Sequence, residues 1–233
     1  MNRTTITFIT ALSIGTFLPI AATAENLPVT AEEQKAMTPD SALKDLMDGN
    51  ARYVKGKLSA PNITARVKAA TTGQYPKAFV LSCIVSRVPV EHVFDQGLGD
   101  IFVGRVAGNI ENGDQLGSME FAAAVSGVKV ILVLGHEACG AVKGACDHVK
   151  MGNLTGLLDN IEPAIKKVKG HEEKGRNSKN KEFVAEVVTM NVKQTVEDIR
   201  SRSETLANLE KEGKIKIVGA VYSLADGKVT AIN

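Results

Sequence analysis

The sequence contains no tryptophan and few other aromatic residues, with only seven phenylalanines and three tyrosines among 233 residues. Proteins that bind single-stranded nucleic acid stack the bases on aromatic side chains, so this scarcity disfavours a base-stacking surface. An excess of one charge is also missing, because 28 basic and 26 acidic residues leave a formal net charge of +2. Such a balance disfavours nucleic acid or an anionic membrane as the main partner. The chain also lacks internal repeats, and its length predicts one compact domain.

Cysteine is scarce as well, with only Cys83, Cys139 and Cys146 in the chain. An odd number excludes a complete disulfide framework. Two interpretations remain open from composition alone. The chain forms one disulfide and keeps one free thiol, or two of its thiolates bind a metal ion that protects them from oxidation.

The N-terminal residues differ in character from the rest of the chain. Arg3 precedes an apolar run, and Ala22-Thr23-Ala24 stand before Glu25. This order is typical of a secretory signal peptide with a small-residue cleavage site. We therefore predict a signal peptide over residues 1–24 and export to the periplasm. A permanent membrane anchor is the alternative, but polar residues interrupt the apolar run and no stop-transfer pattern follows it.

The remaining chain alternates predicted strands and helices, which favours an α/β fold. Residues 25–37 are polar and predict a flexible segment, so a single domain is expected over residues 38–233. Thr38 and Pro39 form an N-cap and first-turn signature for a helix. The predicted strands are apolar on both faces, which indicates a mainly parallel central sheet of about four strands flanked by helices. A terminal hairpin around Ala225-Asp226-Gly227 predicts an antiparallel edge strand. The predicted strands lie at 77–83, 100–106 and 128–137, with helices between and after them.

Two of these strands end in residues that bind soft metal ions. Cys83 ends the first, and "LGHEACG" at the end of the third contains His136 and Cys139 in an H-x-x-C spacing. Ligands of open α/β sheets bind beyond the carboxyl ends of strands, and two cysteines with one histidine are a common ligand set for catalytic zinc. Each motif is weak alone, because a lone H-x-x-C is more often structural and a lone cysteine is more often a buried thiol. Their combination predicts a zinc site.

Together these motifs resemble the β-class carbonic anhydrases. That family carries a C-x-D-x-R stretch at the end of one strand and an H-x-x-C stretch at the end of another. Here the two stretches read "CIVSR" from Cys83 to Arg87 and "HEAC" from His136 to Cys139. The resemblance continues through "SRVPVEHVFDQGLGDIFVGRVAGN", "LGSMEFAAAVSGVKVILVLGHEACGAVKGA" and "GAVYSLADGKV", and covers roughly residues 38–230. The wording around "SRVPVE" and the N-terminal segment resemble the periplasmic-type branch in particular.

The resemblance implies a fold, a cofactor and a reaction. The implied fold is four parallel strands with an antiparallel edge strand, assembled as a homodimer or homotetramer. The implied reaction is the reversible hydration of carbon dioxide to bicarbonate, with one Zn²⁺ per subunit and without nucleic acid or, after signal cleavage, a membrane as partner. By position in the motifs, the resemblance implies metal ligands Cys83, His136 and Cys139, a catalytic arginine Arg87, and substrate contacts Gln74 and Gly140. Arg105 matches a position in a non-catalytic bicarbonate site of a regulated branch. That site also needs a tryptophan where this chain has Val80, so we do not predict it.

Val85 is the one departure inside these motifs, because it stands where the family has an aspartate. In the family, that carboxylate pairs with the arginine and accepts a hydrogen bond from the water on zinc. Valine does neither, and its presence leaves Arg87 without its charge partner. Three interpretations follow: a carbonic anhydrase of altered or weakened activity, an impaired family member that binds zinc or anions, and a hydrolase of a carbon dioxide analogue such as carbonyl sulfide or carbon disulfide.

Overall fold

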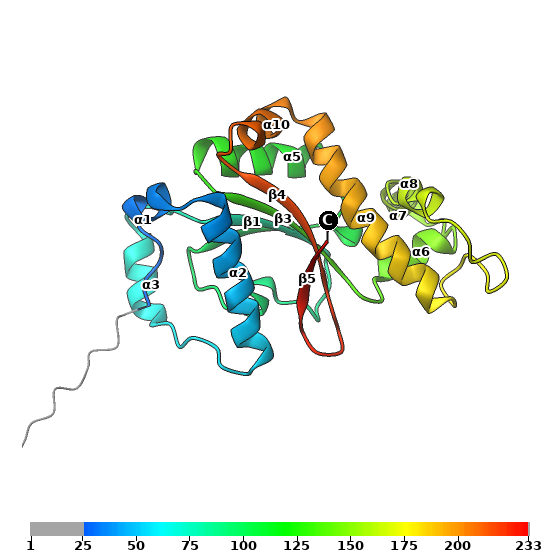
Figure 1. Cartoon of the computed structure of the whole chain (residues 1–233), viewed down its shortest axis with the longest axis horizontal. Helices are drawn as coiled ribbons and strands as arrows, with labels where there is room; N and C mark the ends of the chain where they lie inside the picture. Colours follow the sequence, from blue (N-terminus) through cyan, green and yellow to red (C-terminus); the bar gives the residue numbers. More distant parts are fainter. Residues whose placement is uncertain (1–25, 233) are drawn as a thin grey trace, which may run out of the picture.

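The computed structural model describes residues 26–232, and the predicted signal peptide lies outside the described residues (Figure 1). One five-stranded sheet forms the centre of the molecule, in the strand order β2-β1-β3-β4-β5. Strands β1 to β4 are parallel and β5 runs antiparallel to β4 at the edge, which confirms the predicted fold class. The strands are β1 (Ala78–Ser82), β2 (Ile101–Arg105), β3 (Val130–His136), β4 (Lys216–Tyr222) and β5 (Val229–Ile232).

Helices cover both faces of this sheet. The predicted N-cap at Thr38 is present, because its side chain accepts a hydrogen bond from the Ser41 N–H and begins α2. None of the described helices is long and apolar enough to cross a membrane. The helices are α1 (Ala31–Ala36), α2 (Pro39–Val54), α3 (Ile63–Ala70), α4 (Val90–Val93), α5 (Gly113–Glu120), α6 (Gly140–Cys146), α7 (Gly152–Asp159), α8 (Glu162–Lys167), α9 (Lys181–Arg202) and α10 (Glu204–Lys211). A 3₁₀ turn, η1 (Ala107–Asn109), follows β2, and a π-helical turn, η2 (Phe121–Val125), extends α5.

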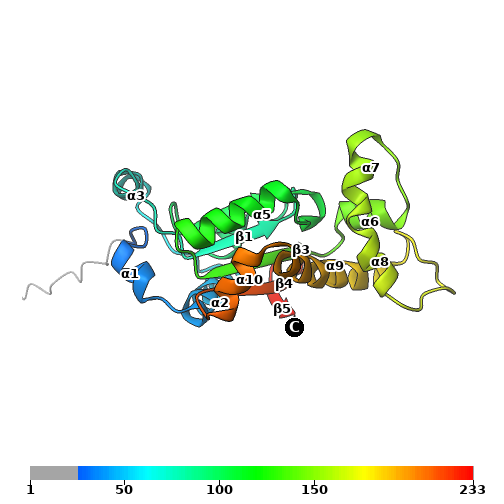
Figure 2. The same cartoon turned by 90° about the horizontal axis from the view of Figure 1, so that it is seen from above.

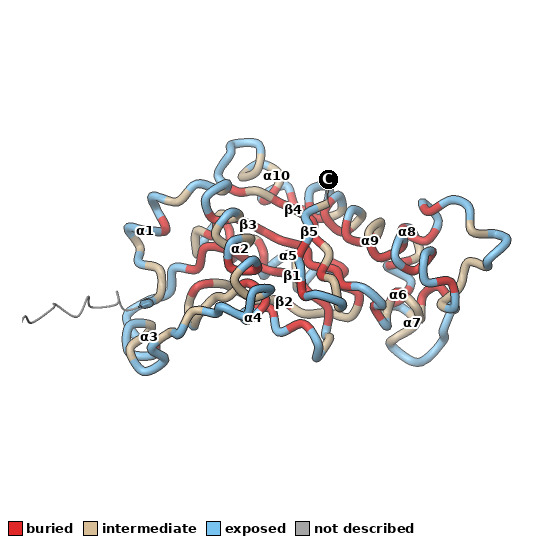
Figure 3. Tube along the Cα trace, turned by 60° about the horizontal axis from the view of Figure 1, so that its bottom comes forward, coloured by how far each residue is buried: buried red, intermediate tan, exposed pale blue. Residues whose placement is uncertain are grey.

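The alternation of side chains along the strands divides the core into two layers. On one face, residues such as Leu81 and Val133 pack against α5, α9 and α10. On the other face, residues such as Val80 and Leu132 pack against α2 and α4. The buried residues follow the strands and the inner sides of these helices in Figure 3.

The segment before α2 is more ordered than the sequence predicts. A flexible stretch was expected over residues 25–37, but a capping box at Thr30 begins α1 there. The buried side chain of Gln34 then donates to the carbonyl oxygens of Pro76 and Ser126. A polar segment can thus be held in place by hydrogen bonds from its side chains to main-chain groups. A prediction based on apolar periodicity does not detect such bonds.

A third apolar cluster lies beyond the carboxyl ends of β1 and β3. Helices α6, α7 and α8 gather there at one end of the sheet (Figure 2). The cluster contains Cys83 and Cys139, together with buried residues of α6, α8 and α9. The fold therefore brings the two cysteine motifs to one edge of the sheet, inside an apolar environment.

Candidate metal centre

The three predicted metal ligands converge. The ligand atoms of Cys83, His136 and Cys139 all lie within 4.8 Å of one another, and all three residues are buried. Cys83 follows the last residue of β1 and His136 ends β3, which is the neighbouring strand. A left-handed residue at Ala138, with φ 51°, turns the chain so that Cys139 faces the same point.

The orientation of His136 leaves one ring nitrogen for a metal. Its Nδ1 lies 2.8 Å from the carbonyl oxygen of Glu137, to which an Nδ1–H donates. Its Nε2 is buried without a hydrogen-bond partner among the described residues. Glu137 is itself fixed, because its N–H donates to Tyr222 and its carboxylate accepts from the Leu224 N–H. The β4–β5 hairpin therefore sets the ring orientation through Glu137, a role that spacing in the sequence did not reveal.

The charges of the two thiols are coupled. The Cys139 thiol donates a hydrogen bond to Cys83, which is the main reason that the pKa of Cys83 is lowered to about 4. The nearby His136 side chain and the hydrogen bond from the Gly108 N–H lower it further, although burial opposes them. The same hydrogen bond to Cys83, together with burial, raises the pKa of Cys139. Without a cation, this pair therefore carries one negative charge rather than two.

This donor set fits a zinc ion. The sulfurs of Cys83 and Cys139 lie 4.0 Å apart, far beyond a disulfide bond of about 2.05 Å. Two thiolates in tetrahedral zinc coordination at about 2.3 Å are separated by about 3.8 Å, close to the observed value. The unpartnered Nε2 of His136 supplies the third ligand atom. All three cysteines are free thiols, so the alternative of one disulfide is wrong.

A cavity of about 400 Å³ opens beside these ligands. Its lining includes Cys83, His136 and Gly140, the last of which begins α6. The wall is otherwise mainly apolar, and Val85 forms part of it; the other apolar lining residues are Ile84, Ala107, Ala141, Leu154 and Leu158. Within the described part of the chain, no acidic side chain lines the cavity. No carboxylate of a neighbouring element therefore replaces the family's aspartate there.

Arg87 also lines this cavity and is exposed. Within residues 26–232 it makes no hydrogen bond or ion pair. Its guanidinium is therefore free to meet an anion that enters the cavity. Asp95, an acidic residue further along the sequence, is bound instead to Arg52 and Ser59.

Gln74 does not lie at this cavity. It precedes β1, whereas Cys83 follows that strand, and it lines a separate cavity with Ile101 and Phe102. Because each strand residue advances the chain by about 3.3 Å, the five steps from Ala78 to Cys83 alone span about 17 Å. Within one chain, Gln74 and the metal ligands are at opposite ends of β1.

Arg105 is the principal residue near the centre whose role the sequence did not reveal. Its guanidinium donates to the carbonyl oxygens of Cys83 and Val88 at 2.9 and 2.8 Å, with a longer contact of 3.5 Å to that of Val85. Arg105 thus holds the loop that carries Cys83, Val85 and Arg87. The family resemblance matched Arg105 only to a bicarbonate site that we did not predict, and nothing in the sequence indicates its main-chain acceptors.

Comparison with known proteins identifies relatives of this chain. A family model described as carbonic anhydrase matches residues 78–229. The chain is 40% identical over 197 residues to a carbonic anhydrase of Mycolicibacterium smegmatis, covering 82% of this chain and 92% of that protein. It is 37% identical over 191 residues to carbonic anhydrase 2 of Mycobacterium tuberculosis, covering 82% and 91% of the two chains.

Solved structures share the fold. The chain superimposes on a tetrameric β-carbonic anhydrase from Sordaria macrospora with a TM-score of 0.62 and 22% identity, over 72% of this chain and 85% of that one. It superimposes on the Coccomyxa β-carbonic anhydrase in complex with acetazolamide with a TM-score of 0.61 and 21% identity, over 82% and 86% of the two chains.

Proposed function

This chain belongs to the β class of the carbonic anhydrase family, a family of lyases, and from that premise we propose that it hydrates carbon dioxide reversibly to bicarbonate and a proton, with one zinc ion per subunit. The observation that carries the proposal is the convergence of Cys83, His136 and Cys139 beside a cavity. When bound by such a ligand set, zinc supplies a Lewis acid with a fourth position at which water loses a proton near neutral pH.

Different residues of the cavity are suited to the substrate and to the product. The apolar wall that includes Val85 and Leu158 accepts an uncharged, weakly polar molecule such as carbon dioxide. The free guanidinium of Arg87 attracts the bicarbonate anion that forms, and the first residue of α6, Gly140, brings main-chain atoms to the same space. The cavity therefore suits a reaction whose substrate is neutral and whose product is an anion.

Val85 weakens the reaction in this proposal. It removes a preorganised hydrogen-bond acceptor beside the metal, and the loss of one such partner lowers a rate by about 10²–10³-fold. The chain retains the three converging ligand residues and the lining residue Arg87, so activity is reduced rather than abolished.

A second candidate follows from the absence of acidic side chains among the described lining residues. A cavity with a zinc site, a free arginine and no carboxylate also suits an impaired family member that binds zinc or anions. Its apolar wall would likewise suit a hydrolase of carbonyl sulfide or carbon disulfide. Turnover of these substrates, measured beside that of carbon dioxide, separates the three possibilities.

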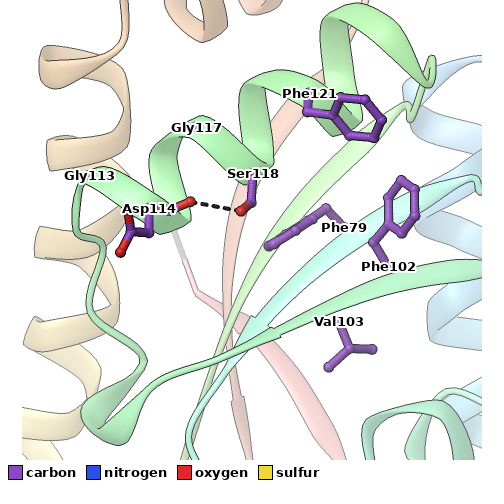
Figure 4. Close-up of a pocket in the computed structure, with 8 residues that line it drawn as sticks. All are labelled: Phe79, Phe102, Val103, Gly113, Asp114, Gly117, Ser118 and Phe121. Atoms are coloured by element: carbon purple, nitrogen blue, oxygen red, sulfur yellow. Dashed lines mark hydrogen bonds between the residues drawn. The ribbon is translucent and has the colours of Figure 1, made fainter.

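A second copy of this chain is the proposed partner. Strand β2 is a sheet edge, and a groove of about 600 Å³ lies between it and α5. The aromatic rings of Phe79, Phe102 and Phe121 surround that groove in Figure 4, and Phe121 is 51% exposed. An exposed apolar surface beside an unpaired strand edge is typical of an interface. We name this surface the β2 groove.

The place of Gln74 supports the same partner. Gln74 lies near β2, in the cavity shared with Ile101 and Phe102, and far along β1 from its own metal ligands. If Gln74 contacts substrate as its position in the family implies, it does so in the cavity of another subunit. This is the reason we propose a homodimer, or a homotetramer built from such dimers, as the active form.

Export is the proposed route of this protein. The order of basic, apolar and small residues in the first 24 positions supports a cleaved signal peptide and a periplasmic location. N-terminal sequencing of the protein from a periplasmic fraction is expected to begin at Glu25. A chain that begins at Met1 in the membrane fraction would contradict this location.

Metal removal tests the proposed reaction. The protein is stripped with a chelator, and carbon dioxide hydration is followed by stopped flow before and after one equivalent of zinc is restored. We expect activity to rise with zinc and to reach its plateau at one equivalent per chain. Cys146→Ser serves as the control, because Cys146 shares the apolar cluster of the two ligand cysteines but is not one of the three converging ligand residues, so its loss should leave this titration unchanged. Activity that does not depend on zinc would refute the proposal.

A further inference from the structure

A buried amide on α9 approaches the metal centre from outside the cavity. Asn191 is 2% exposed and lies on the side of α9 that packs against β3 and β4, next to Val188 and Val192. An amide buried among valines destabilises a fold unless it is hydrogen-bonded. The Nδ2 of Asn191 donates to the carbonyl oxygen of Gly108 at 2.7 Å, across 83 positions of the sequence.

Gly108 is the central residue of the turn η1, and the peptide that follows it is held at both ends. The side chain of Asn191 donates to the carbonyl oxygen of this peptide, which belongs to Gly108. The N–H of the same peptide belongs to Asn109 and donates to the carbonyl oxygen of Val106 at 2.9 Å. The backbone of Gly108 is left-handed, with φ 76°, and a Cβ there would lie 2.8 Å from Cδ1 of Ile161. The turn therefore needs glycine, and it depends on the bond from α9 to fix its orientation.

The turn points a donor at a metal ligand. The N–H of Gly108 donates to Sγ of Cys83 at 3.3 Å. A hydrogen bond to a thiolate withdraws electron density from the sulfur and fixes its direction, and such bonds tune the metal that the thiolate binds. Asn191 is thus connected to Cys83 through a single glycine.

We propose that Asn191 is a positioning residue of the metal centre, which holds Gly108 so that its N–H remains on the sulfur of Cys83. The inference rests on the zinc site of the proposed function. In this proposal α9, which packs on the far side of the turn η1, helps to set the metal affinity and the electron density at the metal.

Asn191→Leu in the full chain tests this inference, because leucine has a similar volume and no donor. Zinc affinity is measured by competition with a chromogenic chelator, and the thiolate-to-metal charge-transfer band is recorded with cobalt in place of zinc. We expect zinc to bind about 10–100-fold more weakly. We also expect the cobalt band to move to longer wavelength, because the sulfur has lost a hydrogen-bond donor. Val192→Ala is the matched control. It removes apolar contacts at the neighbouring position of the same helix, and it should leave the zinc affinity and the cobalt band unchanged.

The outcomes separate this inference from the proposed function. If the native protein does not bind zinc, the proposed function fails and this inference fails with it. If the native protein binds zinc and Asn191→Leu keeps the native affinity and cobalt band, only this inference is overturned, and Asn191 serves packing alone.

A measurement on the native protein decides the matter if Asn191→Leu does not fold. With ¹¹³Cd in the site, a scalar coupling between the metal and the Gly108 amide proton is expected across the N–H···S hydrogen bond. The absence of that coupling would overturn the inference.

Discussion

At the residue scale, the loop from Cys83 to Val88 owes its shape to a side chain from another strand. Arg105 of β2 spans the loop with one guanidinium, which donates to the carbonyl oxygens of its first and last residues. A planar fork of donors is suited to two acceptors in a fixed arrangement, whereas an ammonium group is not. The loop holds a metal ligand at one end and Arg87 near the other, so a change in its shape affects both.

Arg105→Lys therefore should weaken the loop and the metal site together. Lysine keeps the charge but cannot serve both carbonyls, and hydrogen bonds to charged groups contribute about 1.5–3 kcal/mol. We expect the free energy of unfolding to fall by about that amount and zinc to bind about tenfold more weakly. Urea denaturation and chelator competition provide the two measurements.

Arg176→Lys is the matched control for that change. Arg176 also donates to two main-chain carbonyls, those of Gly170 and Ile165, but in the loop after α8. Its loss should lower stability without changing zinc affinity. Equal losses of zinc affinity in both variants would show that Arg105 has no particular relation to the metal site.

The convergence of the three candidate ligands could be predicted from the sequence, and their surroundings could not. Cys83, His136 and Cys139 are soft ligands at strand ends, a pattern that spacing alone exposes. Glu137 and Gly108 act through main-chain atoms, which carry no sequence signal of their own. Asn191 acts across 83 positions, and a single buried asparagine in a helix predicts no particular partner.

At the scale of elements, short turns rather than strands determine how closely the two motifs approach. The turn η1 follows β2 and contacts both β1 and β3, whose ends carry Cys83 and His136. Its central residue adopts a conformation that only glycine takes without strain. The metal site therefore forms only if this turn is stable.

Gly108→Ala is expected to destabilise the protein by about 1–3 kcal/mol, since alanine is strained at φ 76° and its Cβ would meet Ile161. Gly156→Ala is the control, because Gly156 lies inside α7 with open space around the missing Cβ. That change should stabilise the protein by about 0.5–1 kcal/mol. Thermal unfolding of both variants measures the difference, and a stable Gly108→Ala protein would contradict the role given to the turn.

The connection between α2 and α3 depends on one carboxylate. Burial opposes the ionisation of Asp95, but hydrogen bonds from Arg52 and Ser59 outweigh it and leave its pKa lowered. A carboxyl whose folded pKa is lowered contributes stability above its unfolded pKa of about 3.9, and this is lost as the pH falls through the folded pKa.

Asp95→Asn should therefore lower the free energy of unfolding by about 1–3 kcal/mol at pH 7. Asparagine tolerates the left-handed backbone at this position, where φ is 49°, so the change isolates the charge. The difference from the native protein should shrink as the pH falls from the unfolded pKa of Asp95 through its lower folded pKa, and vanish in stronger acid. Asp159→Asn, which removes an exposed ion pair with Lys150, should have little effect at any pH. A difference that persists unchanged in acid would show that ionisation of Asp95 is not involved.

Most elements could be predicted because their signals are local. The alternation of apolar strands with capped helices indicates the sheet, and the turn around Asp226 indicates the terminal hairpin. Two features escaped prediction because they depend on distant partners. One is α1, which is held through Gln34, and the other is the break at Ser203, which separates α9 from α10.

At the scale of the whole molecule, the single chain has its candidate metal ligands at one end of β1 and Gln74 at the other. The β2 groove lies along the edge strand adjacent to β1; Phe121 lines it and is exposed, and Val125, at the other end of the same turn η2, is exposed as well. A partner bound there would cover these side chains. It would also bring a second set of residues near each cavity.

Phe121→Glu is expected to prevent this association. Phe121 is half exposed in the single chain, so a charge there disturbs an interface more than a core. Analytical ultracentrifugation should find a dimer or tetramer for the native protein and a monomer for the variant, with a lower rate of carbon dioxide hydration. Met151→Glu is the control, because Met151 is 64% exposed just before α7, away from the β2 groove. A native protein that is monomeric and fully active would contradict the proposed assembly.

The central claim is that the Cys₂His zinc centre still hydrates carbon dioxide although Val85 replaces the acidic partner of Arg87. Stopped-flow hydration by the zinc-loaded native protein, beside Val85→Asp and Cys83→Ser, tests it most directly. We expect the native rate to lie well above that of Cys83→Ser, and Val85→Asp to raise it by about 10²–10³-fold. A native rate no higher than that of Cys83→Ser would contradict the claim. If Val85→Asp then restored turnover, the scaffold would be intact and the chemistry switched off at this one residue.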